Sequence, residues 1–400
     1  MLETQLFLRG EGEEELKNKF KLKISRHREH SNLLQFSYGK TSVDFAHPIV
    51  QECRGLILDS KNNWSVVAFP YAKFFNWGEA LGTDIDWRTA SVTEKIDGSL
   101  AILYWYMDKW YVASSATADG SAILGKDMIF ADLFWEIWNK NGYALPEENH
   151  FTFMFEFFSP RCPVVVKADH DSIILHGVRD NKSFEELDPK VTAEKYRWEC
   201  VQSFEFSSLQ HVLDASKRLN PAQQEGFVVR DASFNRVKVK SPQYVALAHL
   251  NFSDSVSLNA RHMLRIVVKD EGSEFLVHFP HFKQLHQLVH TALNNLIGKF
   301  ELVLQYNVDK VDEKNSVAFA SLVSVMKQRK VEDIREFLSE FEDLDLLFSL
   351  LDIGLDVSPE DEKHSHFIKP SQNVVKGQKI SKKEKTQMKR DRQRKTNKFE

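Results

Sequence analysis

The sequence of 400 residues has few cysteines and no long apolar run. Its three cysteines, Cys53, Cys162 and Cys200, lack metal-ligand spacing and leave one thiol unpaired, which predicts a reducing compartment and no disulfide framework. No apolar stretch approaches the roughly 20 residues that cross a bilayer, and residues 1–20 are too charged for a signal peptide. We therefore expect a soluble cytoplasmic protein that is not secreted.

Charge is unevenly distributed along the chain. Residues 376–400 hold 11 of the 53 Lys and Arg residues but only 3 of the 57 Asp and Glu residues. The remaining residues therefore carry 42 basic against 54 acidic side chains, a net charge of −12. An acidic body with a basic tail indicates a polyanionic partner. The alternative is a disordered end that only aids solubility.

The first part of the chain is typical of a strand-rich domain. Short β-branched and aromatic runs separated by turn residues fill residues 1–248. The stretch 100–115 predicts a hairpin with a two-residue turn at 108–109. Helices are expected near 127–141 and 205–218.

The character of the sequence changes after about residue 249. Residues 249–357 predict a helical domain, because apolar side chains recur there at helical spacing. Polar residues dominate 358–400, which predicts a linker followed by the basic tail. The helical spacing is carried by Phe282, Leu285, Leu288, Val289, Ala292, Leu296 and Phe300, and again by Ile334, Phe337, Leu338 and Phe341.

One lysine is notable for its position. Lys95 lies two residues before Asp97 and Gly98, at the edge of the apolar run 99–107. A Lys-x-Asp-Gly tetrapeptide is a weak signal alone, since it arises by chance on the order of once in ten chains of this length. The two interpretations are an exposed lysine before a turn and a nucleophile.

Five further segments carry charged residues, and each of the last three sets its charge into an apolar, strand-like run. Each has an ordinary interpretation by itself: a surface or ion-paired arginine, a paired or edge-strand carboxylate, or a solvated strand face. Together with Lys95 they favour a nucleotide-binding site. In chain order they are Arg54 in QECRGLILD, Lys73 and Phe75 in YAKFFNW, Glu156 in FMFEFFSP, Glu225 in QEGFVVRD, and Lys238 and Lys240 in RVKVKSP.

The two lysines of the last segment indicate an anionic ligand. Lys238 and Lys240 are separated by one residue, so they point to the same face of a strand. Two like charges on one face cost free energy unless an anionic group lies between them. A triphosphate is such a group.

The same residues suit nucleotide chemistry. A lysine attacks the α-phosphorus of a nucleotide only as a neutral amine, whereas a lysine with its ordinary pKa of about 10.4 is protonated near neutral pH. Nearby cations or a divalent metal favour the neutral amine, and Lys238 and Lys240 are candidates for this effect on Lys95. Glu156 and Glu225 can bind ribose hydroxyls or hold magnesium through water. An aromatic ring such as Phe75 can stack on the base.

Several of these motifs resemble those of a known family. EKIDGSL, FEFFSP, EGFVV and VKVK resemble the lysine-adenylating motifs of covalent nucleotidyltransferases, which include ATP-dependent ligases and capping enzymes. FSYG, ECRG and KFFN narrow the resemblance to the bacteriophage RNA ligase 1 family, the ATP-dependent RNA ligases that repair tRNA. The similarity covers roughly residues 30–250.

The resemblance implies a role for each matching residue. Lys95 is the adenylated nucleophile, and ATP and Mg²⁺ are the cofactors. The family implies attack of this lysine on ATP, transfer of AMP to an RNA 5′-phosphate, and sealing by a 3′-hydroxyl. The other matching positions are ATP contacts at Tyr38, Arg54 and Lys73, catalytic and phosphate-binding positions at Glu156, Lys238 and Lys240, and the acidic residue that opens the fourth motif, Glu225.

The sequence departs from the family pattern in two places. The segment SSATADGS lacks the basic residue that the family often carries after the hairpin, which weakens the expectation of RNA-phosphate contacts there. The family also has an acidic, metal-linked position after its last core motif. Asp270, Glu271 and Glu274 are available in KDEGSEF, and Glu274 is favoured.

These observations predict an α+β fold. Residues 1–248 form an antiparallel-sheet adenylyltransferase core unrelated to the ATP-grasp ligases, residues 249–357 an all-helical domain, and residues 358–400 a linker and disordered basic tail. By the resemblance, the protein joins RNA 3′-OH and 5′-phosphate ends in RNA repair, with cleaved tRNA as a substrate by analogy alone and a phage origin that places it in the host cytoplasm. The alternatives are a DNA ligase, a GTP-dependent capping enzyme and a non-catalytic RNA-binding protein.

Overall fold

The structure, a computed structural model, describes residues 1–39, 43–124, 127–162, 164–166, 168–250, 260–306 and 316–351. Over these residues the chain combines helices with antiparallel sheets, which confirms the predicted α+β class. One pair of strands, in the sheet that carries Lys95, runs parallel. None of the described helices is long and apolar enough to cross a membrane.

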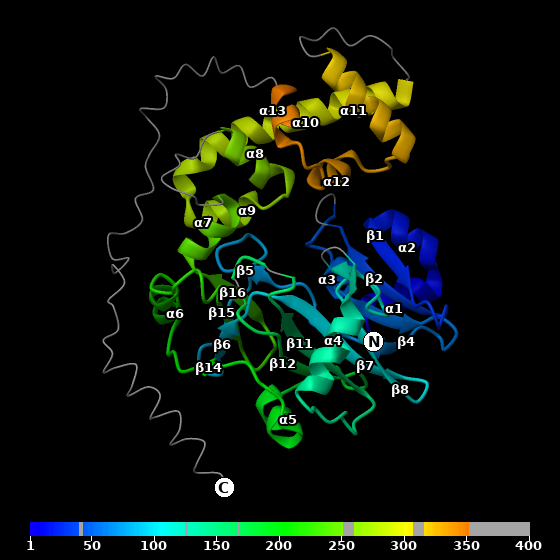
Figure 1. The fold of residues 1–400 in the computed structure, drawn as a ribbon, viewed down its shortest axis with the longest axis vertical. Coiled ribbons are helices and arrows are strands. Elements are labelled where there is room, and N and C mark those ends of the chain that lie inside the picture. The colour runs from blue at the N-terminus through cyan, green and yellow to red at the C-terminus, as the bar shows by residue number, and fades with distance from the viewer. Residues whose placement is uncertain are drawn as a thin grey trace. The chain divides into compact units, whose positions relative to one another are not determined.

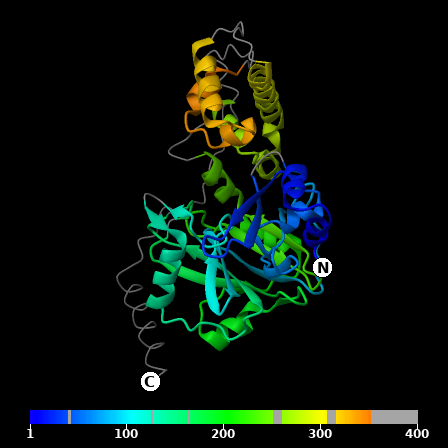
Figure 2. The same ribbon diagram turned by 90° about the vertical axis from the view of Figure 1, so that its right-hand side faces the viewer.

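One five-stranded sheet contributes most of a large apolar cluster of the core. Its order is β13 (Glu186–Leu187), β12 (Ser172–Asp180), β11 (Phe151–Phe158), β7 (Ser99–Tyr106) and β8 (Lys109–Ala113). Helix α4 (Phe130–Lys140) confirms the predicted helix near 127–141. Figures 1 and 2 show it running along this sheet, on which it packs through Phe130, Leu133, Phe134, Ile137 and Trp138.

Strand β11 is apolar on both of its faces, as a strand covered on both sides must be. Its sequence is FTFMFEFF, and Glu156 is its one charged residue. In the register, Glu156 lies opposite Leu100 on β7 and Ile174 on β12. Burying a carboxyl group among these side chains costs free energy unless it has a polar partner. Its presence therefore indicates that this strand contributes to a functional site as well as to the core.

The predicted hairpin is confirmed, but its turn lies one residue earlier than expected. Strand β7 ends at Tyr106 and β8 begins at Lys109, and these two residues pair. The turn residues are therefore Met107 and Asp108, with φ of 46° and 60°. Positive φ at both positions is the two-residue turn whose twist matches that of the flanking strands.

A second five-stranded sheet carries most of the charged residues singled out in the sequence. Its order is β14 (Ser203–Phe204), β6 (Ser91–Lys95), β15 (Gly226–Arg230), β16 (Arg236–Lys240) and β5 (Phe75–Asn76). Helix α6 (Leu209–Ser216) confirms the predicted helix near 205–218 and adds Val212 to the apolar cluster of this sheet. In β16, Val237 and Val239 are buried in that cluster, so Lys238 and Lys240 share the opposite face, as predicted.

The N-terminal region forms a four-stranded antiparallel sheet in the order β1 (Leu22–Arg26), β2 (Leu33–Tyr38), β3 (Leu56–Asp59) and β4 (Ser65–Ala68). The sequence did not predict four short helices of the core. Each has five to eight residues, too few for a 3.6-residue period to stand out. They are α1 (Glu3–Gly10), α2 (Glu13–Phe20), α3 (Pro48–Glu52) and α5 (Pro189–Tyr196), and a small ribbon of β9 (Ile123–Leu124) and β10 (Met128–Ile129) precedes α4.

The described residues after β16 are helical, which confirms the predicted change of character. The periodic residues 334–341 form one short helix that ends at Ser339. A second short helix begins at Leu344, where the Asp343 carboxylate caps it by accepting from the Leu346 amide. The domain boundary at 248 stays a prediction, and residues 358–400 lie outside the described residues. The helices are α7 (Pro242–Leu250), α8 (Ala260–Val268), α9 (Gly272–His278), η1 (Pro280–Phe282), α10 (Lys283–Tyr306), α11 (Ser316–Arg329), α12 (Ile334–Ser339) and α13 (Leu344–Ser349).

Candidate active site

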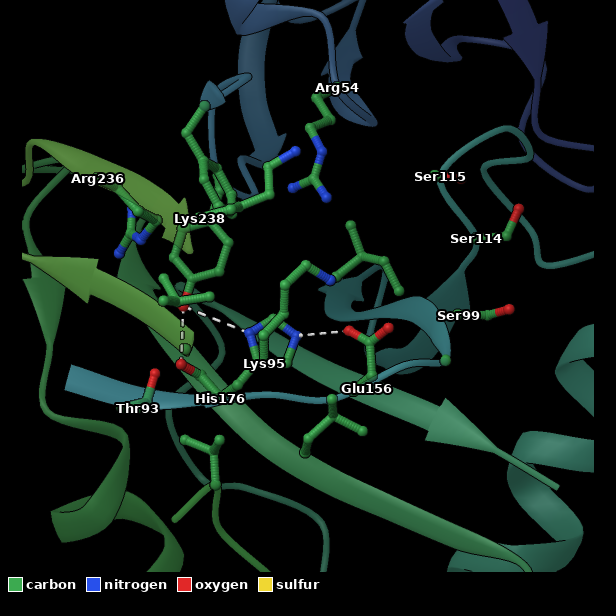
Figure 3. A pocket seen from close by; sticks show the side chains of 18 of the residues that line it. Arg54, Thr93, Lys95, Ser99, Ser114, Ser115, Glu156, His176, Arg236 and Lys238 are labelled. Atoms are coloured by element: carbon green, nitrogen blue, oxygen red, sulfur yellow. Dashed lines mark hydrogen bonds and ion pairs between the residues drawn. The ribbon is translucent and has the colours of Figure 1, made fainter. Parts of the chain in front are cut away.

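Lys95 is the last residue of β6, at the edge of a cavity of about 840 Å³ that it lines (Figure 3). The turn that follows is held close to β11. A Cβ on Gly98 would lie 2.6 Å from the Phe157 carbonyl oxygen, so a side chain cannot be accommodated without a backbone shift. The Asp97 carboxylate anchors the turn from the other side by accepting from the Val166 amide at 2.7 Å. The turn that follows Lys95 is therefore held in one conformation, which fixes the position of the lysine at the edge of the cavity.

A carboxylate lies between two of the predicted lysines. Glu225 Oε2 is 2.5 Å from Lys95 Nζ, and Glu225 Oε1 is 3.1 Å from Lys240 Nζ. The register explains this arrangement, because Gly226 pairs with Lys95 on one side and with Lys240 on the other and carries no side chain of its own. The Glu225 side chain is 4% exposed. The structure thus brings together three residues that are 130 and 15 positions apart in sequence.

Glu274 adds a second carboxylate beside Lys240. Its Oε1 lies 2.7 Å from Lys240 Nζ. Lys240 and Glu274 line a second, smaller cavity of about 250 Å³ and are not among the residues around the larger one. The two carboxylates raise the pKa of Lys240, against the effect of its burial, so this lysine is firmly cationic.

Lys238 has a different environment from Lys240. It lines the larger cavity, and no carboxylate pairs with it within the described part of the chain. Its Nζ lies 5.2 Å from the centre of the Phe74 ring, and the Arg54 guanidinium lies 5.4 Å from the same ring. Burial, together with the charges of nearby cations, lowers the pKa of Lys238 to about 7. An anion bound here would relieve that repulsion.

Arg54 and Tyr38 form another edge of the cavity. Burial raises the pKa of Tyr38. The charge of Arg54 and its hydrogen bond to Tyr38 partly oppose this rise. The Arg54 Nη1 atom is buried and has no hydrogen-bond partner within the described residues. A buried, unpaired guanidinium N–H is costly, and an anionic ligand in the cavity would satisfy it.

Lys73 and Phe75 lie beside the cavity and not among its lining residues. The Lys73 ammonium sits over three rings, those of Phe45 at 4.3 Å, Phe75 at 5.4 Å and Tyr38 at 5.6 Å. Burial lowers the pKa of Lys73. The neighbouring ring, Phe74, lines the cavity instead. The sequence therefore identified the aromatic segment, but tertiary packing decided which of its two rings faces the cavity.

Glu156 points into the cavity from β11, with its Oε2 3.5 Å from Nε2 of His176 on β12 (Figure 3). Burial is the largest cause of the raised pKa of Glu156, about 7, which makes this carboxyl group a weaker acid than usual. Burial also lowers the pKa of His176 to about 3, assisted by the charges of Arg54 and Arg236. Both groups are therefore biased toward their neutral forms.

Arg236 and His176 line the cavity and were not identified from the sequence. Arg236 pairs with Glu186 at 2.5 Å and stacks 4.0 Å from the centre of the Tyr71 ring. Its position two residues before Lys238 on the same strand face was a signal that could have identified it. His176 had no such signal, because its orientation depends on how β12 pairs with β11.

The loop that follows β8 contributes hydroxyl groups and no cation to the cavity. Ser114 and Ser115 line it, together with Ser99 from β7 (Figure 3). The Ser114 hydroxyl accepts from the amides of Ala116 and Thr117, which holds the loop in a tight turn. The described part of this loop therefore agrees with the departure noted in the sequence.

Comparisons with known proteins agree with the motifs. Residues 52–244 match a family model described as RNA ligase. The chain is 28% identical over 309 residues to a protein of Autographa californica nuclear polyhedrosis virus, provisionally described as a bifunctional polynucleotide kinase/RNA ligase, with 71% of this chain and 43% of that protein aligned. It is 31% identical over 178 residues to an RNA ligase of Rhodothermus phage RM378, with 35% of this chain and 40% of that protein aligned.

Solved structures with a similar arrangement include an archaeal ATP-dependent RNA ligase. It is 11% identical, with 82% of this chain and 90% of that chain covered, at a TM-score of 0.42. The aligned residues span less than half the length of the two curated relatives, 43% and 40%.

Proposed function

Because residues 52–244 match a family model described as RNA ligase, we propose that this chain is an ATP-dependent RNA ligase. It joins an RNA 3′-OH to a 5′-phosphate by way of lysyl-AMP and RNA-adenylate intermediates. The observation that carries this proposal is the position of Lys95 at the edge of a cavity where Lys238 and Arg54 stand without carboxylate partners among the described residues.

In the first step Lys95 attacks the α-phosphorus of ATP. A phosphorus–nitrogen bond forms, the bond to the bridging oxygen breaks, and pyrophosphate leaves. The amine must first leave Glu225 and give up its proton. Lys238 and Arg54 suit the binding of the triphosphate, because each is a partly buried basic side chain that lines the cavity. Phosphate binding in turn favours the charged form of Lys238, whose pKa of about 7 leaves it partly neutral in the free chain.

The remaining predicted residues have supporting roles in this proposal. Tyr38 and Lys73 hold the Arg54 side of the site, and Lys240 and Glu225 hold Lys95 between turnovers. Glu156 offers a carboxyl group to the ribose hydroxyls. Phe75 was expected to stack on the base, and Phe74 is the better placed ring because it lines the cavity.

A divalent metal fits this site only together with a nucleotide. Within the described residues, no group of three or more His, Cys, Asp and Glu side chains could hold a metal alone. Mg²⁺ commonly takes most of its ligands from substrate phosphates and water, so few protein ligands are required. Glu274 is the proposed protein contact, after release from Lys240. The metal would neutralise charge on the phosphate oxygens.

The RNA substrate is the finer part of the proposal. A cleaved tRNA in an RNA repair reaction is the substrate that the family resemblance favours, and the basic segment 376–400 would add affinity for the RNA backbone. Removing 376–400 should then weaken RNA binding and leave lysyl-AMP formation unchanged. Loss of lysyl-AMP formation on that truncation would contradict this division of roles.

Two other enzyme classes are separated by simple observations. A DNA ligase of this superfamily usually has a β-barrel after its last motif, whereas the described residues after β16 are helical. A capping enzyme would accept GTP. Incubation with α-labelled ATP or GTP, followed by denaturing electrophoresis, should label the chain with ATP alone.

The proposal is tested by intact mass spectrometry after incubation with ATP and Mg²⁺. The native chain should gain the mass of one AMP, and Lys95→Ala should gain none. Lys182→Ala, which removes an exposed lysine far along the sequence, is the matched control and should be adenylated as the native chain is. No gain in the native chain, or an equal gain in Lys95→Ala, would overturn the assignment. A chain that binds RNA but is never adenylated would instead support the non-catalytic alternative.

A further inference from the structure

His176 occupies an irregular position in the central sheet. Along β12, Gly177 pairs with Met154 and Leu175 pairs with Phe155, so His176 has no partner residue on β11. Such a β-bulge places two residues opposite one and redirects the side chain of the extra residue. Here it turns the imidazole toward Glu156 in the cavity (Figure 3).

Tyr71 contacts the other side of this imidazole. Its hydroxyl donates to the His176 carbonyl oxygen at 2.7 Å and lies 3.4 Å from His176 Nδ1. The fit is close, because a Cβ on Gly177 would lie 1.9 Å from the Tyr71 hydroxyl oxygen. Tyr71 is buried, with 7% of its surface exposed. Bulk water therefore does not compete with the His176 carbonyl for the proton of this hydroxyl group.

The hydrogen bonds of Tyr71 determine which nitrogen of His176 carries the proton. A tyrosine hydroxyl has one proton, and that of Tyr71 is already donated to the His176 carbonyl. Toward Nδ1 the hydroxyl oxygen can only accept, so Nδ1 must bear the hydrogen. The backbone carbonyl of Phe155 is a further acceptor beside the ring. In the neutral imidazole, Nε2 is then a lone-pair acceptor.

This tautomer has a consequence for Glu156. Nε2 makes no hydrogen bond within the described residues, and its one ion-pair contact there is Glu156 Oε2, at 3.5 Å. A lone pair attracts a carboxylic acid proton and repels a carboxylate. The environment agrees with this, because burial disfavours charge on both groups.

We propose that Tyr71 and His176 are positioning residues that hold Glu156 as a neutral carboxylic acid, hydrogen-bonded to Nε2, in the nucleotide-free chain. Resting on the proposed function, this arrangement removes one negative charge from a cavity that must admit a triphosphate. It also fixes the orientation of the carboxyl group that meets the ribose.

The tautomer is tested directly by ¹⁵N NMR of the histidine rings in the full chain without nucleotide. The chain has 15 His residues, and the His176 signals are assigned by their loss in His176→Gln. The proposal expects Nδ1 protonated and Nε2 bare near neutral pH. An Nε2–H tautomer or an imidazolium in the native chain would overturn it. This result does not depend on catalysis, so absent lysyl-AMP would overturn the proposed function alone.

Variants separate positioning from a purely structural role. Tyr71→Phe removes one of the two acceptors at Nδ1 and leaves the Phe155 carbonyl, so the fraction of the Nε2–H tautomer should rise. Tyr104→Phe is the matched control, because that buried hydroxyl also donates to a backbone carbonyl at 2.7 Å, on Ala118, and it should leave the His176 signals unchanged. Equal ring signals in Tyr71→Phe and the native chain would contradict the proposal.

The same variants have distinct kinetic expectations for lysyl-AMP formation. Loss of one hydrogen bond that orients Glu156 should raise KM for ATP roughly two- to tenfold, with a smaller change in kcat. His176→Gln can still present an amide oxygen to Glu156 and should retain most of the affinity, whereas His176→Leu should not. Equal KM values for these two variants would contradict the positioning role.

Discussion

Lys95 and Glu225 form an ion pair at 2.5 Å between adjacent strands, and the same carboxylate reaches Lys240. The predicted nucleophile is thus paired with a buried carboxylate in the free chain. The sequence had instead predicted that the charges of Lys238 and Lys240 would favour its neutral amine directly. Lys240 is itself paired twice, with Glu225 and Glu274. Of these three lysines, Lys238 is therefore the one without a carboxylate partner among the described residues, and the one that we propose binds the incoming phosphate.

Removing the charge of Glu225 should destabilise the free chain. In Glu225→Gln two partly buried ammonium groups lose their shared carboxylate, and breaking a buried pair in this way costs about 3 kcal/mol. Urea unfolding should show this loss in the free energy of unfolding. Glu94→Gln is the control, since only burial shifts the pKa of Glu94, upward, and it should cost less than about 1 kcal/mol. Equal effects would show that the ion pairs contribute little.

The stability of the free chain should depend on pH through Lys238. Its folded-state pKa of about 7 lies below the ordinary value of 10.5. Between these values the unfolded chain binds the extra proton, so this group's penalty is full below pH 7 and disappears as pH rises to 10.5. Lys238→Met should therefore raise the free energy of unfolding on the order of 2 kcal/mol near pH 7 and by less near pH 10.

Urea unfolding of both chains at several pH values checks this expectation. Lys182→Met, at an exposed position, serves as the control and should give a pH-independent difference. A stabilisation by Lys238→Met that did not shrink between pH 7 and 10 would contradict a lowered pKa. The same variant should bind ATP more weakly, because it removes a cation from the cavity.

A side chain at Gly98 should disturb both the fold and the first chemical step. In Gly98→Ala the new Cβ meets the Phe157 carbonyl oxygen, and such overpacking costs about 1–3 kcal/mol. Since the backbone shift would displace the Lys95 turn, lysyl-AMP formation should slow by at least tenfold. Gly298→Ala, in α10 with open space at its Cβ, should instead stabilise the chain by about 0.5–1 kcal/mol. Unchanged kinetics in Gly98→Ala would remove the turn from the mechanism.

Phe74 and Phe75 should differ in their effect on ATP binding. The ring of Phe74 lines the cavity and is shared by the cationic groups of Lys238, Arg54 and Arg236. Phe74→Leu should raise KM for ATP roughly fivefold, since each cation–π contact contributes about 0.5–1 kcal/mol. Phe75→Leu should have a smaller effect. A larger effect at Phe75 would support the interpretation made from sequence alone.

Much of this protein follows from local sequence. The aromatic run of β11 predicted a strand, and alternation placed Lys238 and Lys240 on one face of β16. The motifs around Lys95, Glu156 and Glu225 identified the charged residues of the proposed nucleotide site. These features are readable because side-chain period and motif spacing are properties of neighbouring residues.

Other features depend on contacts between distant segments. The bulge that turns His176 toward Glu156, the choice of Phe74 over Phe75 at the cavity, and the sharing of Glu225 by two lysines come from strand register and side-chain packing. The short helices α1, α2, α3 and α5 were missed because they are too short for a periodic signal. Sequence determined which chemical groups this chain carries and on which face of a strand they lie. Tertiary structure decided which of them meet and which are neutral, because burial and pairing energies exist only once distant strands are adjacent.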